Sequence, residues 1–211
     1  MRIVRETSSR TGPRMKAPST ARERILREAI RLFADRGYDR TSIPEIQAAA
    51  GLSRGSGALY KHFPSKEALL AAAVDQFVDT ARQGRTELAE MPRPIDHKAR
   101  QLVEGMLEKL GANRDTLRIL WRDLEHFSQL RSKARDEIMA RTYLAVAGWL
   151  KEGQRRGELR PHDSEAVAAV IVGSVAMFRV FEAIWGERAI DVSDERFAAA
   201  WSDLLARGLQ P

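Results

Sequence analysis

Cysteine is absent from this chain of 211 residues. Its absence excludes disulfide bonds, thiolate metal sites and a cysteine nucleophile. The four histidines, at positions 62, 97, 126 and 162, are scattered and lack the spacing of a zinc site. The composition therefore predicts neither a metal nor a cofactor.

Long hydrophobic runs are also missing. The longest apolar run, Ala166–Phe178, has 13 residues, whereas a membrane-spanning helix needs about 20. Residues 1–18 are basic and polar, without the apolar centre of a signal peptide. With 44% hydrophobic and 30% charged residues, the chain is expected to be a soluble, cytoplasmic protein with no membrane partner.

Proline does not occur in two long stretches, 95–160 and 162–210. Apolar residues recur there with the helical period of 3.6, and no segment alternates as a half-buried strand does. We therefore predict an all-α fold of about nine helices. Their approximate bounds are 20–36, 42–50, 56–63, 65–90, 95–111, 114–127, 132–156, 163–186 and 194–208.

Capping signals fix several of these ends. Thr20 and Ser42 are each followed three residues later by a glutamate, which predicts two capping boxes. Gly37 and Gly51 end the first two helices, and Ser65 begins the long fourth helix.

Positive charge is concentrated at one end of the chain. Residues 1–66 hold 14 Lys and Arg against 6 Asp and Glu, whereas residues 67–211 hold 21 against 23. The excess persists without residues 1–18, because residues 19–66 hold nine basic against five acidic residues. A basic head on a slightly acidic body indicates a polyanionic partner. We expect a disordered basic arm at 1–18, a head at 19–66 and a body at 67–211.

The segment GLSRGSGALYKHFPSK, residues 51–66, contains the turn after the second expected helix, the third expected helix and the start of the fourth. Three short helices joined in this way are the helix-turn-helix pattern of DNA-binding proteins. Small residues at the start of the third helix let its backbone approach phosphates, and its N-terminal dipole favours an anion. Leu59 and Phe63 are expected to face the core, so that the polar residues between them point outward.

Residues 20–74 resemble the DNA-binding head of the TetR family of transcriptional regulators. The signatures LFADRGYDRTSI, AAAGLS, GALYKHF and PSKEALL carry the resemblance over about a quarter of the chain. It implies an all-α homodimer that binds a double-stranded DNA operator, usually as a repressor. A variable C-terminal domain is then expected to bind a small effector that weakens operator binding.

The resemblance also implies roles for individual residues. Thr41 and Ser42 are expected to bind phosphates at the start of the second helix, and Lys66 to pair with another phosphate. The remaining DNA-binding candidates are Arg54, Ser56, Gly57, Tyr60, Lys61 and His62. The segment from Gly51 to Tyr60 is two residues longer than usual in the family, which leaves Ser53 and Ser56 as alternative caps. Pro44 stands where many relatives carry a polar residue that reads a base.

Two further surfaces are expected in the body. The helix at 163–186 is apolar on most sides, which predicts burial against more than one neighbour, and the resemblance places the dimer interface at 163–208. Its candidate residues are Val167, Val170, Ile171, Val175, Phe178, Phe197 and Trp201. The candidate lining of an effector pocket is Met106, Trp121, Phe127, Met139, Tyr143 and Trp149.

Three other classes of function compete with this one. An enzyme is not expected, because Gly55-Ser56-Gly57 matches neither a nucleophile elbow nor a phosphate-binding loop. A helical adaptor protein with a vestigial head, and a transcriptional activator, both remain open.

Overall fold

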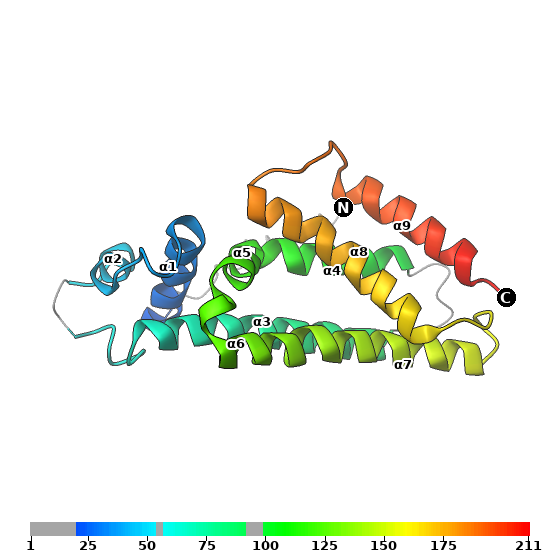
Figure 1. Cartoon of the computed structure of the whole chain (residues 1–211), viewed down its shortest axis with the longest axis horizontal. Coiled ribbons are helices and arrows are strands. Elements are labelled where there is room, and N and C mark those ends of the chain that lie inside the picture. Colours follow the sequence, from blue (N-terminus) through cyan, green and yellow to red (C-terminus); the bar gives the residue numbers. More distant parts are fainter. Residues whose placement is uncertain (1–19, 54–56, 92–98) are drawn as a thin grey trace, which may run out of the picture.

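The computed structural model describes residues 20–53, 57–91 and 99–211. Within these ranges the chain forms α-helices, one 3₁₀ turn and one π-helical segment, and no strand. The all-α prediction is confirmed. Figure 1 shows an elongated molecule with the N-terminal helices at one end and long helices running along the rest. The expected arm at 1–18 lies outside the described residues.

The head begins with α1 (Ala21–Arg36) and α2 (Ile43–Ala49). Both predicted capping boxes are present, Thr20 with Glu23 and Ser42 with Glu45. The third helix predicted at 56–63 is wrong for the part of the segment that is described. Residues 58–62 form turns instead, closed by hydrogen bonds of 2.9 Å from the backbone N–H groups of His62 and Phe63 to the Leu59 carbonyl.

A single helix joins the head to the body. α3 (Lys66–Ala89) begins at the Ser65 cap, as predicted, and continues into the body. Its buried residues Leu70 and Phe77 belong to a core cluster that contains Ile25 of α1 as well as Ile119 and Val180 of the body. This apolar core is therefore continuous from the head into the body.

The body contains the remaining elements in chain order. They are α4 (Ala99–Ala112), α5 (Arg114–Arg122), the 3₁₀ turn η1 (Leu124–His126), α6 (Ser128–Lys133), the π-helical η2 (Ala134–Ala140), α7 (Arg141–Arg155), α8 (Ser164–Trp185) and α9 (Asp194–Leu209). The long helix predicted at 132–156 is therefore present as the continuous run α6–η2–α7 (Figure 1). Its π-helical part was not predicted.

A second core cluster lies among α4, α7, α8 and α9. It corrects part of the expected dimer interface, because Ile171, Val175 and Trp201 are buried inside the single chain. The Trp201 indole Nε1 donates to the Ser174 hydroxyl at 3.0 Å, and the rings of Phe178 and Phe197 stack at 4.1 Å. Val167 is half-buried against the same cluster. Val170, another predicted interface residue, is 71% exposed in the single chain.

The helix α8 is long and apolar enough, by length and composition alone, to cross a membrane. It packs against α4, α5 and α7, and it carries the buried Arg179. The Arg179 guanidinium donates to the carboxylates of Glu182 and Asp194 and to the Leu107 carbonyl. The buried charge of Arg179 is thus paired and hydrogen-bonded within the protein.

Candidate nucleic-acid interface and ligand cavity

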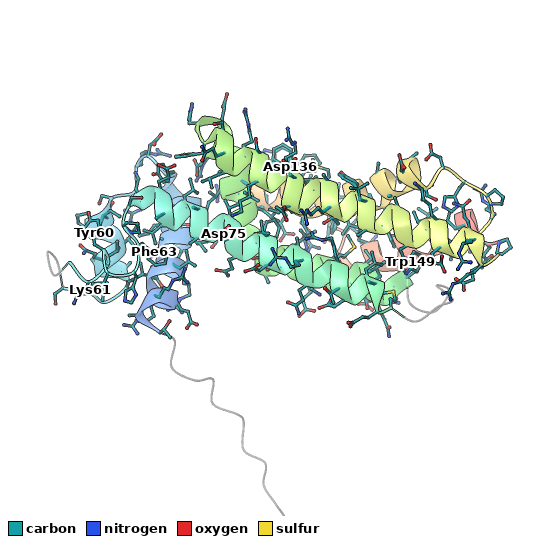
Figure 2. All side chains as sticks on the ribbon, turned by 90° about the horizontal axis from the view of Figure 1, so that it is seen from below. Tyr60, Lys61, Phe63, Asp75, Asp136 and Trp149 are labelled. Carbon is teal, nitrogen blue, oxygen red and sulfur yellow. The ribbon has the colours of Figure 1, made fainter. Side chains whose placement is uncertain are left out.

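The turn after Gly57 presents three side chains to solvent. Tyr60 is 54% exposed, and Lys61 and His62 are also exposed, whereas Leu59 and Phe63 are buried. Figure 2 shows Tyr60 and Lys61 at the end of the molecule. The alternation arises because Leu59 and Phe63 fix the turn to the core, which leaves the three residues between them to point outward. We call Tyr60, Lys61 and His62 the tip.

Two glycines shape the approach to the tip. Gly51 has φ +70° and Gly57 has φ +63°, in the left-handed region that residues with a Cβ rarely adopt. A Cβ at either position would meet no atom within 4 Å, so the backbone conformation and not crowding requires glycine there. Arg54 and Ser56, two of the predicted DNA contacts, lie outside the described residues.

Thr41 does not occupy the place that the sequence predicted. Its side chain is 1% exposed, and its hydroxyl donates to the carbonyls of Gly37, at 2.8 Å, and Leu32, at 3.2 Å. The hydroxyl therefore holds the end of α1 to the start of α2. In this conformation it faces away from solvent and cannot donate to a phosphate, which corrects the expected contact.

Ser42 is exposed at the N-terminus of α2. Its hydroxyl donates to the Glu45 carboxylate at 2.7 Å and accepts from the Glu45 backbone N–H at 3.4 Å. The Ser42 hydroxyl and the Ser42 backbone N–H, which also donates to the Glu45 carboxylate at 2.8 Å, lower the pKa of Glu45 below its ordinary value. Ser42 thus caps the helix, and its exposure leaves the predicted phosphate contact open.

Lys66 is the second residue whose place differs from expectation. Its ammonium donates to the carbonyls of Tyr38, at 2.9 Å, Thr41, at 3.0 Å, and Asp39, at 3.5 Å. It also lies 4.2 Å from the centre of the Tyr38 ring. An ammonium group has three N–H donors, and three carbonyl oxygens of the turn between α1 and α2 lie within hydrogen-bonding distance of its nitrogen. In this conformation Lys66 ties that turn to α3, and no donor is left for a phosphate.

An apolar cavity of about 140 Å³ lies in the body, between α3, α4, α7 with its π-helical extension, and α8. Met106 and Met139, two of the predicted lining residues, are in its wall. The other lining residues are Phe77, Thr80, Ala81, Gly84, Arg85, Leu88, Leu102, Lys109, Leu110, Ile138, Thr142, Val146, Ile171, Val172 and Ala176.

Four predicted lining residues lie elsewhere. Trp121 is 58% exposed on α5, and Phe127 packs edge-on against the Tyr38 ring of the head at 4.8 Å. Tyr143 is half-buried beside the second core cluster, and Trp149 is buried within it. Figure 2 shows Trp149 on the side of the molecule away from the tip. Helical spacing predicted packing correctly for Phe127, Tyr143 and Trp149 and wrongly for Trp121, and it could not indicate which space each residue faces.

The body also binds the end of α1 directly through hydrogen bonds. The Arg122 guanidinium, at the end of α5, donates to the Ala34 carbonyl at 3.0 Å and to the Phe33 carbonyl. The neighbouring Asp123 carboxylate accepts from the same guanidinium at 3.0 Å and holds it in place. The last carbonyls of a helix have no partner within the helix. Arg122 binds two of them, of which the Phe33 carbonyl also accepts from the Gly37 backbone N–H at 2.8 Å. This contact was not predicted, because its partners are backbone atoms 88 and 89 residues away.

Among the described residues, no cluster of three or more His, Asp or Glu side chains is placed to hold a metal ion.

Two family models match the chain. The model of bacterial regulatory proteins of the TetR family matches residues 25–73, which include α1, α2, the tip and the start of α3. The model of the C-terminal domain of AefR-like transcriptional repressors matches residues 98–203. The first matched segment thus covers the helix-turn-helix region and seven residues beyond it, and the second lies within residues 67–211.

Curated relatives and solved structures give the same class. The regulator UidR of Escherichia coli strain K12 is 27% identical over 148 residues, covering 70% of this chain and 74% of UidR. The regulator YerO of Bacillus subtilis is 34% identical over 97 residues, but this alignment covers only 46% of the chain and 31% of YerO. The structure of the fatty acid degradation regulator FadR from Bacillus halodurans superposes with a TM-score of 0.70 at 19% identity, covering 92% of this chain and 98% of that one. This last likeness concerns the fold alone.

These relatives are transcriptional regulators, which is not an enzymatic class. The C-terminal family model alone covers half of the chain, and the N-terminal model covers the helix-turn-helix segment. The chain belongs to the TetR family of bacterial transcriptional regulators.

Proposed function

We propose that the protein is a ligand-responsive repressor, which binds a palindromic operator as a homodimer and is released by a small, mostly apolar effector. One observation carries the proposal: a single helix connects the exposed tip to the apolar cavity. α3 begins at Lys66, just behind the tip, and passes the cavity at Arg85. These two residues lie about 28 Å apart along the helix axis, at about 1.5 Å per residue.

The DNA-binding surface of this proposal is the tip together with its surroundings. Tyr60, Lys61 and His62 enter or border the major groove, and Ser42 contacts the backbone at the start of α2. Arg54, Ser56 and Gly57 belong to the same surface as predicted contacts. Phosphate contacts position such a head and base contacts specify the sequence. Thr41 and Lys66 are excluded from direct contact in the proposal, because they hold the head together internally.

The dimer surface is supported by an unpaired apolar stripe on α8. Val170 is 71% exposed, Phe181 40% and Trp185 61%, and they recur at near-helical spacing on one side of the helix. The rings of Phe181 and Trp185 stack on each other at 4.9 Å. On α9, Leu204 is exposed as well. A second copy of the chain is the proposed partner, because a two-fold pair places two tips about 34–36 Å apart, or a multiple of that distance, on successive turns of DNA.

The switch is a shift between two arrangements of the body. An effector in the cavity separates α3 from α4 and α7, and the head moves because α3 and Arg122 both hold it. The shift requires that the effector bind the DNA-incompetent arrangement more tightly than the other. The cavity of about 140 Å³ is smaller than the 300 Å³ or more of typical ligand pockets, so it accommodates a small effector and must enlarge for a larger one.

The test is selection of bound duplexes from a random DNA pool by the purified full chain. The proposal predicts enrichment of one inverted repeat, with half-sites one or more helical turns apart. Enrichment of a single, unrepeated half-site would remove the dimer from the proposal. A pool that stays random at low salt would remove DNA binding and leave the helical adaptor as the better account.

Activation instead of repression depends on where the operator lies relative to a promoter. Placing the selected sequence over a reporter promoter separates the two, because a repressor lowers expression and an activator raises it. In either case the site of action is the bacterial chromosome, so we place the protein in the cytoplasm.

A further inference from the structure

We infer that the effector is an apolar monocarboxylic acid whose carboxylate pairs with Arg85. The inference rests on the proposed function in one respect, since it takes the cavity to be the effector site. It adds the chemical class of the effector and the residue that selects it.

The first observation is the sign of the charge in the cavity wall. Among the residues that line it, Arg85 and Lys109 are the charged ones, and both are cationic. Thr80 and Thr142 are the polar neutral ones, and the rest of the wall is apolar or glycine. No acidic residue belongs to the described lining. A cavity of this composition favours a ligand with an apolar body and a single anionic group.

The two cations differ in their present partners. The Lys109 ammonium is paired with the Glu87 carboxylate at 2.5 Å and is therefore already neutralised. The Arg85 guanidinium donates only to neutral oxygens, the Glu137 carbonyl at 3.0 Å and the Thr142 hydroxyl at 3.4 Å. Across the described residues, no carboxylate lies within ion-pair distance of Arg85, although its neighbours on α3 and α7 are paired. Arg82 bonds Asp79 at 2.6 Å, and Arg141 bonds Glu137 at 3.1 Å.

The surroundings of Arg85 on balance disfavour its positive charge. Partial burial, followed by the positive charge of Arg141, lowers the pKa of Arg85 below the ordinary arginine value, and the negative charge of Glu137 offsets this only in part. A guanidinium does not lose its proton at neutral pH, so the unfavourable charge remains. A carboxylate beside it would relieve this cost and can accept two parallel N–H bonds from the planar fork of arginine.

The two acceptors of Arg85 lie in and directly after the π-helical segment Ala134–Ala140. The Glu137 carbonyl belongs to that segment, and the Thr142 hydroxyl itself donates to the Ile138 carbonyl at 2.5 Å. Helical hydrogen bonding is irregular there, and such segments recur at functional sites. A bound carboxylate would draw the guanidinium away from these oxygens, so the same residue would both recognise the acid and loosen α7 from α3.

The size of the cavity restricts the apolar body of the ligand. A dry cavity of about 150 Å³ accommodates benzene, so the volume of about 140 Å³ fits one ring or a short chain. Met106 and Met139 line the wall, and their flexible side chains make room more readily than branched ones. We therefore expect benzoate, hexanoate and octanoate to act as probes of the site.

The experiment is calorimetric titration of the full chain at neutral pH, where carboxylic acids are ionised. Benzoate, hexanoate and octanoate are compared with benzyl alcohol, hexanol and octanol, which share the apolar bodies but lack the charge. Arg85→Gln is expected to weaken binding of the acids about tenfold or more and to leave the alcohols unchanged. Arg85→Lys keeps the positive charge without the planar fork of arginine. Its affinity for acids should lie between that of the unaltered protein and that of Arg85→Gln.

The matched control is Arg82→Gln, which removes an arginine from the same helix outside the cavity wall. It should leave the affinity for acids unchanged. Thermal unfolding without ligand, together with operator binding, checks that each variant is folded.

The inference is overturned if no acid binds, or if acids and alcohols bind equally. It is also overturned if a cation such as choline binds in place of the acids, or if Arg85→Gln leaves the affinity for acids intact. These outcomes are distinguishable from failure of the proposed function, because operator binding is measured separately on the same samples. A protein that binds its operator but ignores the acids keeps the proposed function and loses this inference.

Discussion

At the scale of single residues, a substitution of Lys66 tests most clearly whether a predicted DNA contact has a structural role instead. Lys66→Met removes the bonds from the ammonium to the Tyr38 and Thr41 carbonyls and keeps the aliphatic stem. We expect the free energy of unfolding to fall by about 1–3 kcal/mol, since carbonyls lose a charged donor. We also expect the dependence of operator affinity on salt to stay the same. Chemical denaturation and a salt titration of DNA binding measure the two quantities.

Lys61→Met is the matched control, because Lys61 is exposed in the tip. It should leave stability unchanged and reduce the salt slope by about one. If Lys66→Met instead lowers the slope by about one at unchanged stability, Lys66 contacts a phosphate as the sequence had suggested.

What the sequence predicted for single residues depended on how local their partners are. Thr20, Ser42 and Ser65 cap helices whose N–H groups are three residues away, so spacing alone identified all three. Thr41 and Lys66 bond carbonyls across the head, 9 and 28 residues away at the farthest. A polar side chain beside a helix start has the same sequence pattern whether it faces inward or outward, so their burial was not predictable.

At the scale of elements, Arg122 is the expected coupling between body and head. Arg122→Met removes the bonds from α5 to the last carbonyls of α1. We expect a fall of about 1.5–3 kcal/mol in the free energy of unfolding, the usual range for a bond to a charged group. We also expect the effect of octanoate on operator affinity to shrink, while the affinity for octanoate itself stays the same.

Arg114→Met is the control, because Arg114 donates to the Gly186 carbonyl at 3.0 Å from the other end of α5. It should lower stability without reducing the coupling. Operator affinity measured with and without octanoate decides between the variants, and equal coupling in all of them would show that α3 alone transmits the change.

The helices themselves were predictable because proline, glycine and capping residues mark their ends, and Gly37 and Gly51 end α1 and α2 as expected. The π-helical segment Ala134–Ala140 was not, since none of these signals marks it in the sequence. Where a third helix was expected, residues 58–62 form turns in the described part of the chain. The sequence showed the extra length of that segment but not its effect on the backbone.

At the scale of the whole molecule, the apolar stripe of α8 is expected to hold two copies together. Val170→Glu places a charge in the proposed interface at a residue that is 71% exposed in the single chain. We expect the dimer to dissociate at micromolar concentration and operator affinity to fall at least tenfold, with the fold of each chain retained. Sedimentation velocity and DNA titration measure both effects.

Leu144→Glu is the control, because Leu144 is similarly exposed on α7, outside that stripe. It should stay dimeric. A Val170→Glu variant that also stays dimeric would show that a different face pairs the two copies.

The dimer interface was only partly predictable, because burial within one chain and burial between two chains give the same sequence pattern. Apolar periodicity predicted that α8 is buried on several sides, but it could not divide those sides between one chain and two. The packing of α9 along α4 buries Trp201 within the chain. Ile171 and Val175 of α8 are buried in the same core cluster. The stripe that contains Val170, Phe181 and Trp185 is what remains.

The most direct measurement of the central claim is the affinity of the full chain for its selected inverted repeat, by fluorescence anisotropy over a range of salt concentrations. The account predicts tight binding that weakens steeply with salt, and a variant with Tyr60→Ala and Lys61→Ala that is folded and dimeric but binds the repeat no better than random DNA. If that variant bound as the unaltered protein does, the tip would not be the DNA-binding surface and the account would be contradicted.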